Sequence, residues 1–338
     1  MRTALAFIFV FGLLTIFHEL GHFLAAKRVG ILVEEFGVGL GPQLWAHRWG
    51  ETRYSVRLFP LGGFVRMLGE EEGTEESERS FRRQSVLSRL LVIGAGPVMN
   101  FVLAAVLFAL IFFVAGVPAA GTRIAGVVSG QPAAIAGLKA GDVIVGIDGE
   151  PVRTWEQVVS GISRRAGQET RITVRRAGRE LTFSLVPRPA EGEGGRGVIG
   201  IQRVMERYRP FLSLYWGARQ TVGTTLFILV RLGQMIMQRA PADVAGPVGI
   251  VQVVGEVART GLINLLSLAG LLSVNLGLFN LFPIPLLDGG QLVIISWEGL
   301  RGEPLGPERE GLVKLIGVIL LLAILVLATY QDLLRLGV

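Results

Sequence analysis

Residues 3–28 read TALAFIFVFGLLTIFHELGHFLAAKR, an almost continuously apolar stretch that closes with a Lys-Arg pair. A helix needs about 20 apolar residues to cross a bilayer, and this stretch is long enough. A cleaved signal peptide begins in the same way, but its core is plain hydrocarbon, whereas two histidines and a glutamate interrupt this one. We therefore expect residues 1–28 to form a retained transmembrane helix.

The composition of the whole chain supports a membrane protein. Of its 338 residues, 51% are hydrophobic and only 18% are charged, whereas a soluble domain carries about a quarter charged residues. Three further apolar regions lie at 95–118, 261–297 and 311–332, and each can span a bilayer. The expected fold class is a multi-pass α-helical membrane protein with four transmembrane helices.

Charge and cysteine content exclude some functions. The formal net charge is +6, yet no stretch joins a basic patch to a nucleic-acid-binding pattern, so we expect no nucleic-acid partner. Basic residues that flank membrane spans explain the charge better. The chain has no cysteine, which excludes disulfides, cysteine nucleophiles and cysteine-based metal sites.

The region between the first two apolar stretches, residues 29–94, has a different pattern. Residues 54–58 alternate apolar and polar side chains, and residues 60–63 supply proline and glycine before a second short strand at 64–67. This pattern predicts a β-hairpin. Residues 81–93 place apolar side chains on one helical face, which suits a membrane surface. We expect a membrane-associated, re-entrant hairpin and an amphipathic helix on the cytoplasmic side.

Residues 120–190 are soluble in character and predict one small α+β domain. Short apolar strands at 124–128 and 143–147 precede Thr154 and Gln157, which form a capping box at the start of a helix. Two further strands then flank an Ala-Gly turn and predict a second hairpin.

The region 191–260 predicts a linker followed by an amphipathic helix on the membrane surface. It begins with a Gly/Glu-rich stretch, which is typical of a linker. Residues 211–237 are apolar enough to suggest a span, but they carry two arginines.

The sequence His18-Glu19-Leu20-Gly21-His22 matches the His-Glu-x-x-His pattern. At helical spacing the two imidazoles lie one turn apart on the same face, so both can reach one metal ion. Glu19 lies beside them and can accept a proton from water. The alternative is an accidental pattern on a packed helix face, but polar side chains at membrane depth are costly and rarely persist without a role.

A zinc site with two histidines needs a third protein ligand and an open position for water. Because cysteine is absent, the third ligand should be a carboxylate. Asp288 is the best candidate, since it follows an apolar span that Pro283 and Pro285 interrupt, and unwound backbone at membrane depth is tolerated where it lines a cavity. The alternative is an ordinary helix-capping aspartate at the membrane surface.

Several motifs resemble the site-2 protease family, and within it the bacterial RseP-like intramembrane metalloproteases. They are His18 to His22, Gly96-Pro97 with Asn100, and Asn280-Leu281-Phe282-Pro283-Ile284-Pro285-Leu286-Leu287-Asp288-Gly289-Gly290. The resemblance implies that His18, His22 and Asp288 are zinc ligands. It also implies that Glu19 is the catalytic acid/base and that Asn280 helps to hold substrate.

Residues 120–190 are also similar to a bacterial PDZ domain. The matching stretches are Ala133 to Leu138, Ala140 to Ile144 and Ile147 to Gly149. Some relatives carry two such domains in tandem, whereas this chain has room for one. A domain of this kind could bind the new C-terminus of a substrate or exclude bulky ectodomains. The family resemblance favours exclusion, with substrates first trimmed by another protease.

The position of the metal site constrains the topology. The first helix and Asp288 can share a metal only if both lie near the same membrane face. With the PDZ domain outside, as the family implies, four spans bring both ligand sets to the inner half, whereas a fifth span over 211–237 would separate them. We therefore expect a bacterial inner-membrane protein whose PDZ domain is extracytoplasmic and whose active site faces the cytoplasm.

The expected function is intramembrane zinc-dependent proteolysis of single-pass membrane proteins, such as anti-sigma factors or signal-peptide remnants. A membrane helix must unwind before it is cleaved, and we expect the hairpin, through Gly62, Gly63 and Phe64, to hold the unwound segment as an added strand. Two other classes remain open at this stage. One is a non-catalytic PDZ scaffold with a structural metal, and the other is a transporter with a proline-broken helix.

Overall fold

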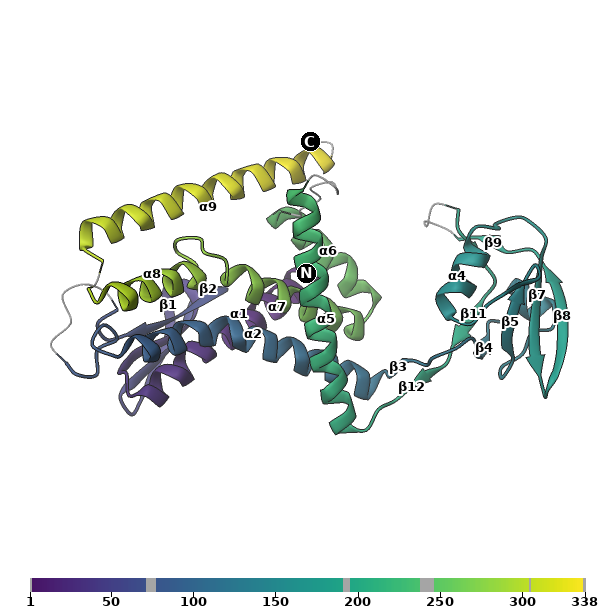
Figure 1. Cartoon of the computed structure of the whole chain (residues 1–338), viewed down its shortest axis with the longest axis horizontal. Helices are drawn as coiled ribbons and strands as arrows, with labels where there is room; N and C mark the ends of the chain where they lie inside the picture. The colour runs from purple at the N-terminus through teal and green to yellow at the C-terminus, as the bar shows by residue number, and fades with distance from the viewer. Residues whose placement is uncertain (1, 71–76, 191–194, 238–245, 304, 337–338) are drawn as a thin grey trace. The chain divides into compact units, whose positions relative to one another are not determined.

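The structure is a computed structural model that describes residues 2–70, 77–190, 195–237, 246–303 and 305–336. The chain divides into two compact units (Figure 1). The membrane unit comprises Met1–Ile111 and Pro210–Val338, and the small unit comprises Phe112–Arg209.

The membrane unit is built from helices and one pair of long strands. The helices are α1 (Arg2–Val29), α2 (Val86–Val114, whose last turn enters the small unit), α5 (Pro210–Ile236), α6 (Pro247–Thr260), α7 (Leu262–Asn280), α8 (Asp288–Arg301) and α9 (Pro307–Leu336). Within the described residues, α1, α2, α7 and α9 are long and apolar enough to cross a membrane. Helix α5 is not among them, because its arginines and small polar residues dilute its apolar content.

Helix α2 begins earlier than the second predicted span. We expected an amphipathic helix over residues 81–93 and a separate span over 95–118, but one continuous helix runs from Val86 to Val114. Pro97 lies inside this helix and removes the hydrogen bond that the Ile93 carbonyl would accept. The helix continues because packing against neighbouring elements tolerates such a break at membrane depth.

The expected span 261–297 consists of two helices. Helix α7 ends at Asn280, and α8 begins at Asp288. The two prolines between them cannot donate to a helix, and Leu286 has a positive φ of 79°, which is unusual for a bulky residue. The break therefore places Asp288 at the first turn of α8.

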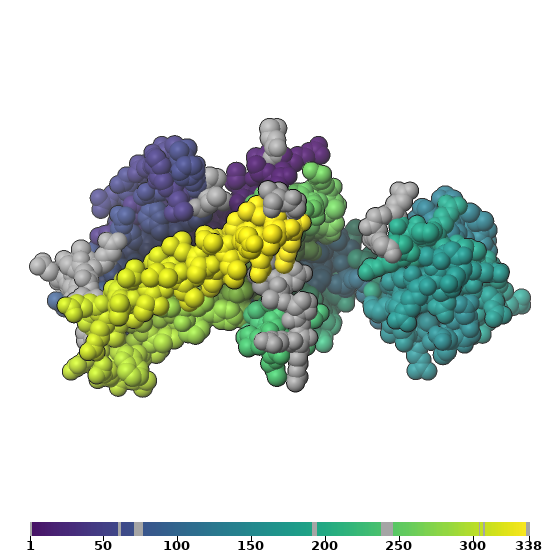
Figure 2. Space-filling model, turned by 90° about the horizontal axis from the view of Figure 1, so that it is seen from above, coloured from purple at the N-terminus to yellow at the C-terminus, as the bar shows by residue number. Residues whose placement is uncertain are grey.

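Helix α9 lies on the surface of the membrane unit (Figure 2). Only 6% of its most apolar 18-residue stretch is buried, whereas 44% of the corresponding stretch is buried in α2 and in α7. It is attached at both ends. Glu310 pairs with Arg82 near its start, and Asp332 accepts hydrogen bonds from the backbone N–H groups of Gly246 and Gly249 near its end.

Strands β1 (Val33–Trp49) and β2 (Thr52–Met67) pair antiparallel and turn at residues 50–51. The predicted hairpin with its turn at 60–63 is therefore wrong. Residues 54–56 and 63–67 both pair with β1 rather than with each other, since Tyr54 and Val65 both lie opposite Phe36.

The sequence conceals this pairing because the buried face of β1 is not apolar. Its inward positions are Val33, Glu35, Gly37 and Gly39, so the alternation that marks a half-buried strand is missing. Gly37 is required there, since a Cβ at this position would overlap the ring of Phe64. A buried charge and two glycines thus occupy positions where a strand pattern predicts apolar side chains.

The hairpin, α1 and α2 share one apolar core. Its buried members are Ala26, Ile31, Val33, Val65, Met67, Phe81, Val92, Ile93 and Ile295. Helices α1 and α2 approach closely at Gly21, where a Cβ would overlap the Ala95 carbonyl. Small residues permit such contacts between membrane helices, where packing replaces the hydrophobic driving force.

The small unit is a compact α+β fold. Its elements are β3 (Val117–Pro118), β4 (Ile124–Val127), α3 (Pro132–Ile135), β5 (Val143–Ile147), β6 (Glu150–Pro151), α4 (Trp155–Ser163), β7 (Thr170–Arg176), β8 (Arg179–Leu185), β9 (Arg188–Pro189), β10 (Gly197–Val198), β11 (Ile201–Arg203) and β12 (Met205–Glu206). The main sheet has the order β6-β5-β7-β8. The predicted capping box of Thr154 and Gln157 is confirmed at the start of α4, and β7 and β8 turn at residues 177–178 as predicted.

The small unit extends beyond the predicted boundary at residue 190. Strand β11 pairs with β4, and β10 pairs with β9. Ile199 joins the buried core with Ile144, Ile172 and Val174. The described residues from 195 to 206 therefore belong to this fold rather than to the linker that the sequence predicts over 191–260.

Candidate metal centre

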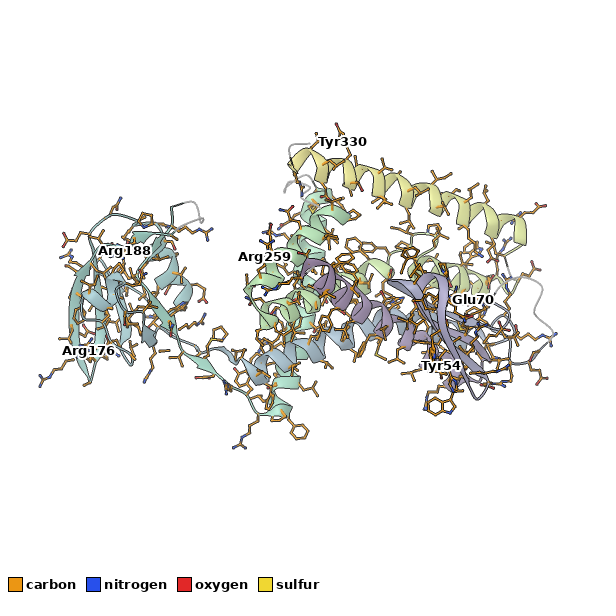
Figure 3. All side chains as sticks on the ribbon, turned by 180° about the vertical axis from the view of Figure 1, so that it is seen from behind. Tyr54, Glu70, Arg176, Arg188, Arg259 and Tyr330 are labelled. Atoms are coloured by element: carbon orange, nitrogen blue, oxygen red, sulfur yellow. The ribbon has the colours of Figure 1, made fainter. Side chains whose placement is uncertain are left out.

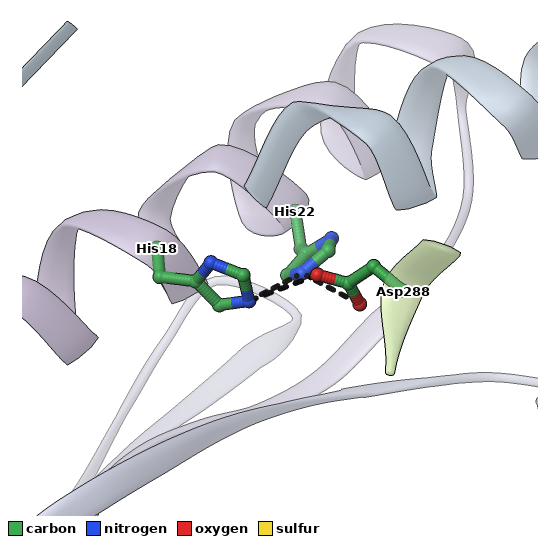
Figure 4. A group of neighbouring side chains, drawn as sticks. All are labelled: His18, His22 and Asp288. Atoms are coloured by element: carbon green, nitrogen blue, oxygen red, sulfur yellow. Dashed lines mark hydrogen bonds and ion pairs between the residues drawn. The ribbon is translucent and has the colours of Figure 1, made fainter. Parts of the chain in front are cut away.

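His18, His22 and Asp288 converge at one point in the membrane unit (Figure 4). Both histidines lie on α1, four residues apart, and are buried. The two Nε2 atoms are 3.2 Å apart. The carboxylate of Asp288 reaches them from α8, with Oδ2 3.1 Å from His18 Nε2 and Oδ1 3.6 Å from His22 Nε2. Residues 266 positions apart in sequence (288 − 22) thus form one cluster.

The backbone around Asp288 is held tightly. A Cβ at Gly289 would overlap the Phe282 carbonyl, and a Cβ at Gly290 would overlap the Ile284 carbonyl. The positive φ of Leu286 lies two residues before the carboxylate, and strain of this kind persists only where the surrounding structure enforces it. The Leu-Asp-Gly-Gly stretch therefore fixes the direction of Asp288 through its backbone as well as its side chain.

Both imidazole rings are oriented by groups on α2. His22 Nδ1 donates to the Val92 carbonyl at 2.9 Å, and the side-chain amide of Asn100 lies 3.1 Å from His18 Nδ1. Gly96 leaves room for the ring of His22, since a Cβ there would overlap His22 Nε2. Groups behind the ligands thus direct both Nε2 atoms toward Asp288.

The donor set fits a zinc ion. Tetrahedral zinc holds nitrogen and oxygen ligands at about 2.0–2.2 Å, which places neighbouring ligand atoms about 3.3–3.6 Å apart. The two Nε2 atoms are 3.2 Å apart, and each has a different Asp288 oxygen nearby, at 3.1 Å for His18 and 3.6 Å for His22. With one ligand atom taken from each residue, all three lie within 4.8 Å of one another. In addition, Asp288 Oδ2 is buried and has no hydrogen-bond partner in the described part of the chain. A buried oxygen of this kind, beside two imidazole nitrogens, is suited to a cation.

A cavity of about 290 Å³ opens beside the cluster. Its walls include Glu19, Gly63, Phe64 and Asn280 as well as the three potential ligands. Gly63 lies close to Glu19, since a Cβ on Gly63 would lie 2.9 Å from the Glu19 Cγ atom. The hairpin and the end of α7 therefore meet the metal-binding motif around one space that can hold a substrate.

The structure brings together most of the predicted site residues. Gly62 does not line the cavity, and its Cα faces Leu40 instead. His47 lies on β1 and stacks on Trp45, so it belongs to the hairpin rather than to the cluster. Sequence reasoning missed Gln291 and Met67, which also line the cavity. The position of Gln291, one helical turn after Asp288, could have indicated it.

Phe64 is held in place by charged neighbours. The guanidinium groups of Arg57 and Arg66 lie 4.7 and 5.8 Å from the centre of its ring, a distance at which cations attract aromatic faces. Glu35 accepts hydrogen bonds from Arg57 at 3.0 Å and from Ser55 at 2.6 Å. Burial raises the pKa of the Glu35 carboxyl, but these hydrogen bonds and the positive charges of Arg57 and Arg53 together lower it below its ordinary value.

The fold and the cluster define a class of protein: a helical membrane protein whose His-Glu-x-x-His helix joins an aspartate in a group that could hold a metal ion, beside a cavity. The sequence profile described as "Peptidase family M50" matches residues 6–324. The chain belongs to this family, and it is a zinc metalloprotease of the site-2 type.

Relatives that match over nearly the whole chain support the assignment. The chain is 32% identical to "Regulator of sigma-W protease RasP" of Bacillus subtilis (strain 168), over 99% of each chain. It is also 32% identical to "Zinc metalloprotease RasP" of Geobacillus kaustophilus (strain HTA426), over 98% of each chain.

Among solved structures, the chain is similar to the PDZ domain of the SdrC-like protein from Listeria monocytogenes. The identity is 26%, and the match covers 26% of this chain and 92% of that one, with a TM-score of 0.23.

Proposed function

We propose that this protein cleaves the transmembrane segments of other membrane proteins. The observation that carries the proposal is the convergence of His18, His22 and Asp288 beside Glu19, in a cavity that the hairpin borders. All of these groups lie in the unit that contains the span-length apolar helices. A peptide bond that reaches this cavity therefore comes from a segment at or within the membrane.

The three ligands of the proposed zinc site are His18, His22 and Asp288. When bound, zinc supplies a Lewis acid that polarises the scissile carbonyl and activates water near neutral pH. The imidazole rings keep their direction because the Val92 carbonyl and the Asn100 amide hold their far sides. A ligand set of three protein groups leaves a fourth position open, as catalytic zinc sites do.

Glu19 acts as the general base and acid. It follows His18 directly on α1 and lines the same cavity. Its carboxylate accepts a proton from the attacking water and then delivers that proton to the leaving amine, so the peptide C–N bond breaks and a new C–O bond forms. The close backbone of Gly63 leaves the Glu19 side chain little room to turn away.

The hairpin presents the substrate as an added strand. Residues 63–67 of β2 pair with β1 on one side, and no third strand pairs with them in the described ranges. Gly63, Phe64, Val65 and Met67 line the cavity. An unwound segment that adds to this edge gains main-chain hydrogen bonds, and Asn280 supplies a side-chain partner from the end of α7. Arg57 does not belong to this free edge, because it pairs with Gln43 of β1.

The small unit acts as a PDZ domain that excludes bulky ectodomains, so that substrates reach the site after another protease has trimmed them. The name of the Bacillus subtilis relative refers to regulation of sigma-W, which favours anti-sigma factors among the substrates. We place the protein in a bacterial inner membrane, with the small unit outside and the metal site toward the cytoplasm. Signal-peptide remnants are a second substrate class, because they too are apolar peptide segments that lie in the membrane.

The decisive experiment compares the native chain with Glu19→Gln in reconstituted bilayers. The substrate is a single-pass protein with a short ectodomain, and zinc content is measured on the same samples. We expect the variant to keep zinc and to lose cleavage by about 10²- to 10⁴-fold, since that is the usual contribution of a general base. Equal cleavage by both chains would overturn the mechanism, and cleavage only outside the membrane segment would overturn the substrate class.

A non-catalytic scaffold is not supported. A structural zinc site closes with four protein ligands, whereas three metal-binding side chains converge here in the described part of the chain and a cavity lies beside them. Family membership also makes the chain a protease.

A further inference from the structure

We infer that Asn100 is a positioning residue for the metal centre: its side-chain oxygen accepts the Nδ1 proton of His18 and so keeps His18 Nε2 free to bind metal. This inference rests on the proposed zinc site. Asn100 lies on α2, is fully buried, and lies 3.1 Å from His18 Nδ1 through its side-chain amide. An amide at this depth is costly unless it has a specific partner.

The neighbour of His22 fixes which ring nitrogen carries its proton. Nδ1 of His22 lies 2.9 Å from the Val92 carbonyl oxygen, and a carbonyl oxygen can only accept. The ring proton of neutral His22 is therefore on Nδ1, and the lone pair of Nε2 points to the cluster. A metal-binding histidine commonly donates its second ring N–H in this way.

His18 has the same requirement but a different neighbour. If Nε2 of His18 binds metal, its ring proton must be on Nδ1, and Nδ1 then needs an acceptor. The group that faces Nδ1 is the Asn100 amide, whose oxygen accepts and whose nitrogen only donates. A 180° turn of the side-chain amide exchanges its oxygen and its nitrogen, which have nearly the same size and shape.

The turned orientation gives the Asn100 oxygen a partner and moves Nδ2 to the place that Oδ1 held, so the choice between the two orientations rests on the proton that His18 must carry on Nδ1. With Nδ2 placed toward His18, the Oδ1 atom is buried and has no hydrogen-bond partner in the described residues. The backbone of Asn100 is fixed independently, because Ser273 on α7 donates to its carbonyl at 2.8 Å. The side-chain amide can therefore turn without any movement of α2, and the turn brings Oδ1 to the Nδ1 proton of His18.

The test measures zinc affinity rather than cleavage, using the full chain in detergent and competition with a chromophoric chelator. Asn100→Leu removes the acceptor at similar volume and should raise the zinc dissociation constant about 10- to 100-fold, the usual effect of losing such a partner. Asn100→Asp keeps only acceptors and should bind zinc within about threefold of the native chain. If the amide instead acted as a donor, the aspartate variant would be as weak as the leucine variant.

Ser273→Ala provides the matched control. It removes the contact between α7 and the backbone of Asn100 but leaves the amide in place, so zinc affinity should stay within about twofold. An equal loss in this variant would show that helix packing, and not the amide oxygen, supports the site. That result, or unchanged affinity in Asn100→Leu, would overturn the inference.

Nitrogen-15 NMR of the imidazole rings provides a second measurement. The chain has only three histidines, so the spectrum can be assigned with single substitutions. We expect the zinc-loaded chain to carry the His18 proton on Nδ1. The inference and the proposed function can fail separately. Zinc affinity that depends on Asn100 without any peptide cleavage would refute the function alone, whereas cleavage lost in Glu19→Gln with no role for Asn100 would refute the inference alone.

Discussion

A buried aspartate in the small unit and a half-buried one in the membrane unit show how differently the same side chain can be used. In the small unit, Asp142 has only 1% of its side chain exposed and is fully paired, since Arg176 donates to both carboxylate oxygens at 2.6 and 2.8 Å and the Lys139 N–H donates at 2.9 Å. Arg176 ends strand β7 (Figure 3). In the membrane unit, Asp288 has 14% of its side chain exposed, faces two imidazoles and keeps one oxygen without a hydrogen bond.

The difference separates a structural carboxylate from a functional one. A buried carboxylate whose oxygens are all hydrogen-bonded has no free oxygen for a further ligand. Its removal leaves the partner's charge without a counter-charge, which destabilises the fold. A buried charge with an unsatisfied oxygen is stable only if something else completes it. Asp142 should therefore matter for folding and not for zinc, whereas Asp288 should matter for zinc and little for the small unit.

The largest expected effect comes from Asp288→Ala. Loss of a metal ligand should lower zinc affinity and cleavage by more than about 100-fold. Mutating a group that only hydrogen-bonds to a metal ligand already lowers metal affinity or activity about 10- to 100-fold. Zinc content and cleavage of a membrane substrate measure both effects. Retention of zinc at native affinity would remove Asp288 from the ligand set and end the contrast with Asp142.

The next effect comes from Gly96→Ala on α2. A Cβ at this position overlaps His22 Nε2, so the ring must turn away from the cluster, and zinc affinity should fall at least about tenfold. Gly94→Ala is the matched control, since a Cβ there meets nothing within 4 Å and alanine is the better helix former. Equal zinc affinity in the two variants would show that the ring tolerates the added methyl group.

Val65→Pro tests the strand edge beside the site. Proline removes a backbone N–H and disfavours pairing, so cleavage should fall about tenfold while zinc content is unchanged. Val65 belongs to the apolar core, and Val65→Ala therefore reports the loss of the side chain alone. If both variants lose cleavage equally, the edge has no special role.

Those parts of the molecule whose signals are local were predictable from sequence. The placement of His18 and His22 on one helix, the capping box at Thr154 and Gln157, and the turn between β7 and β8 each depend on a few neighbouring residues. Their side chains or backbone conformations act within one helical turn or one hairpin. The approximate places of the apolar helices were predictable from length and composition, whereas the start of α2 and the break between α7 and α8 were not.

The remaining features depend on contacts between distant segments. The pairing of β1 was hidden because Glu35 and Gly37 occupy buried positions, and both are explained only by Arg57 and Phe64 on the other strand. The contact of Asn100 with His18 was hidden in the same way, since nothing in α2 indicates which side chain it faces. Sequence patterns report the period of an element, not its partners.

Asp142→Asn should have an effect opposite to that of Asp288→Ala. Breaking the buried pair should destabilise the small unit by about 1–3 kcal/mol, less than for a fully enclosed pair because Arg176 remains partly open to water. Hydrogen exchange of the small unit in the full chain measures this loss, and zinc affinity should not change. Glu180→Gln, in an exposed pair with Arg175 on the same hairpin, is the control and should have little effect.

The same carboxylate predicts the pH dependence of the small unit. The hydrogen bond from Arg176 lowers the pKa of Asp142 below its ordinary value, so the folded unit binds this proton less readily than the unfolded chain. Its contribution to stability is therefore present above the ordinary pKa of about 4 and is lost as the pH falls below it. The native chain should lose more stability on acidification than Asp142→Asn does.

The smallest effect is expected at Glu51, a carboxylate that is as well paired as Asp142 but exposed at the turn of the hairpin. It accepts hydrogen bonds from Arg79 at 2.8 and 2.9 Å and from Lys27 at 2.6 Å, and these lower its pKa to about 2. Glu51→Gln should leave cleavage at pH 7 within about twofold, because exposed ion pairs contribute little. Any difference in melting temperature should shrink in high salt and vanish as the pH falls toward 2, where the native carboxylate also becomes protonated. A tenfold loss of cleavage would instead show that the turn of the hairpin is coupled to the site, and that pairing at the surface can matter as much as the unsatisfied oxygen of Asp288.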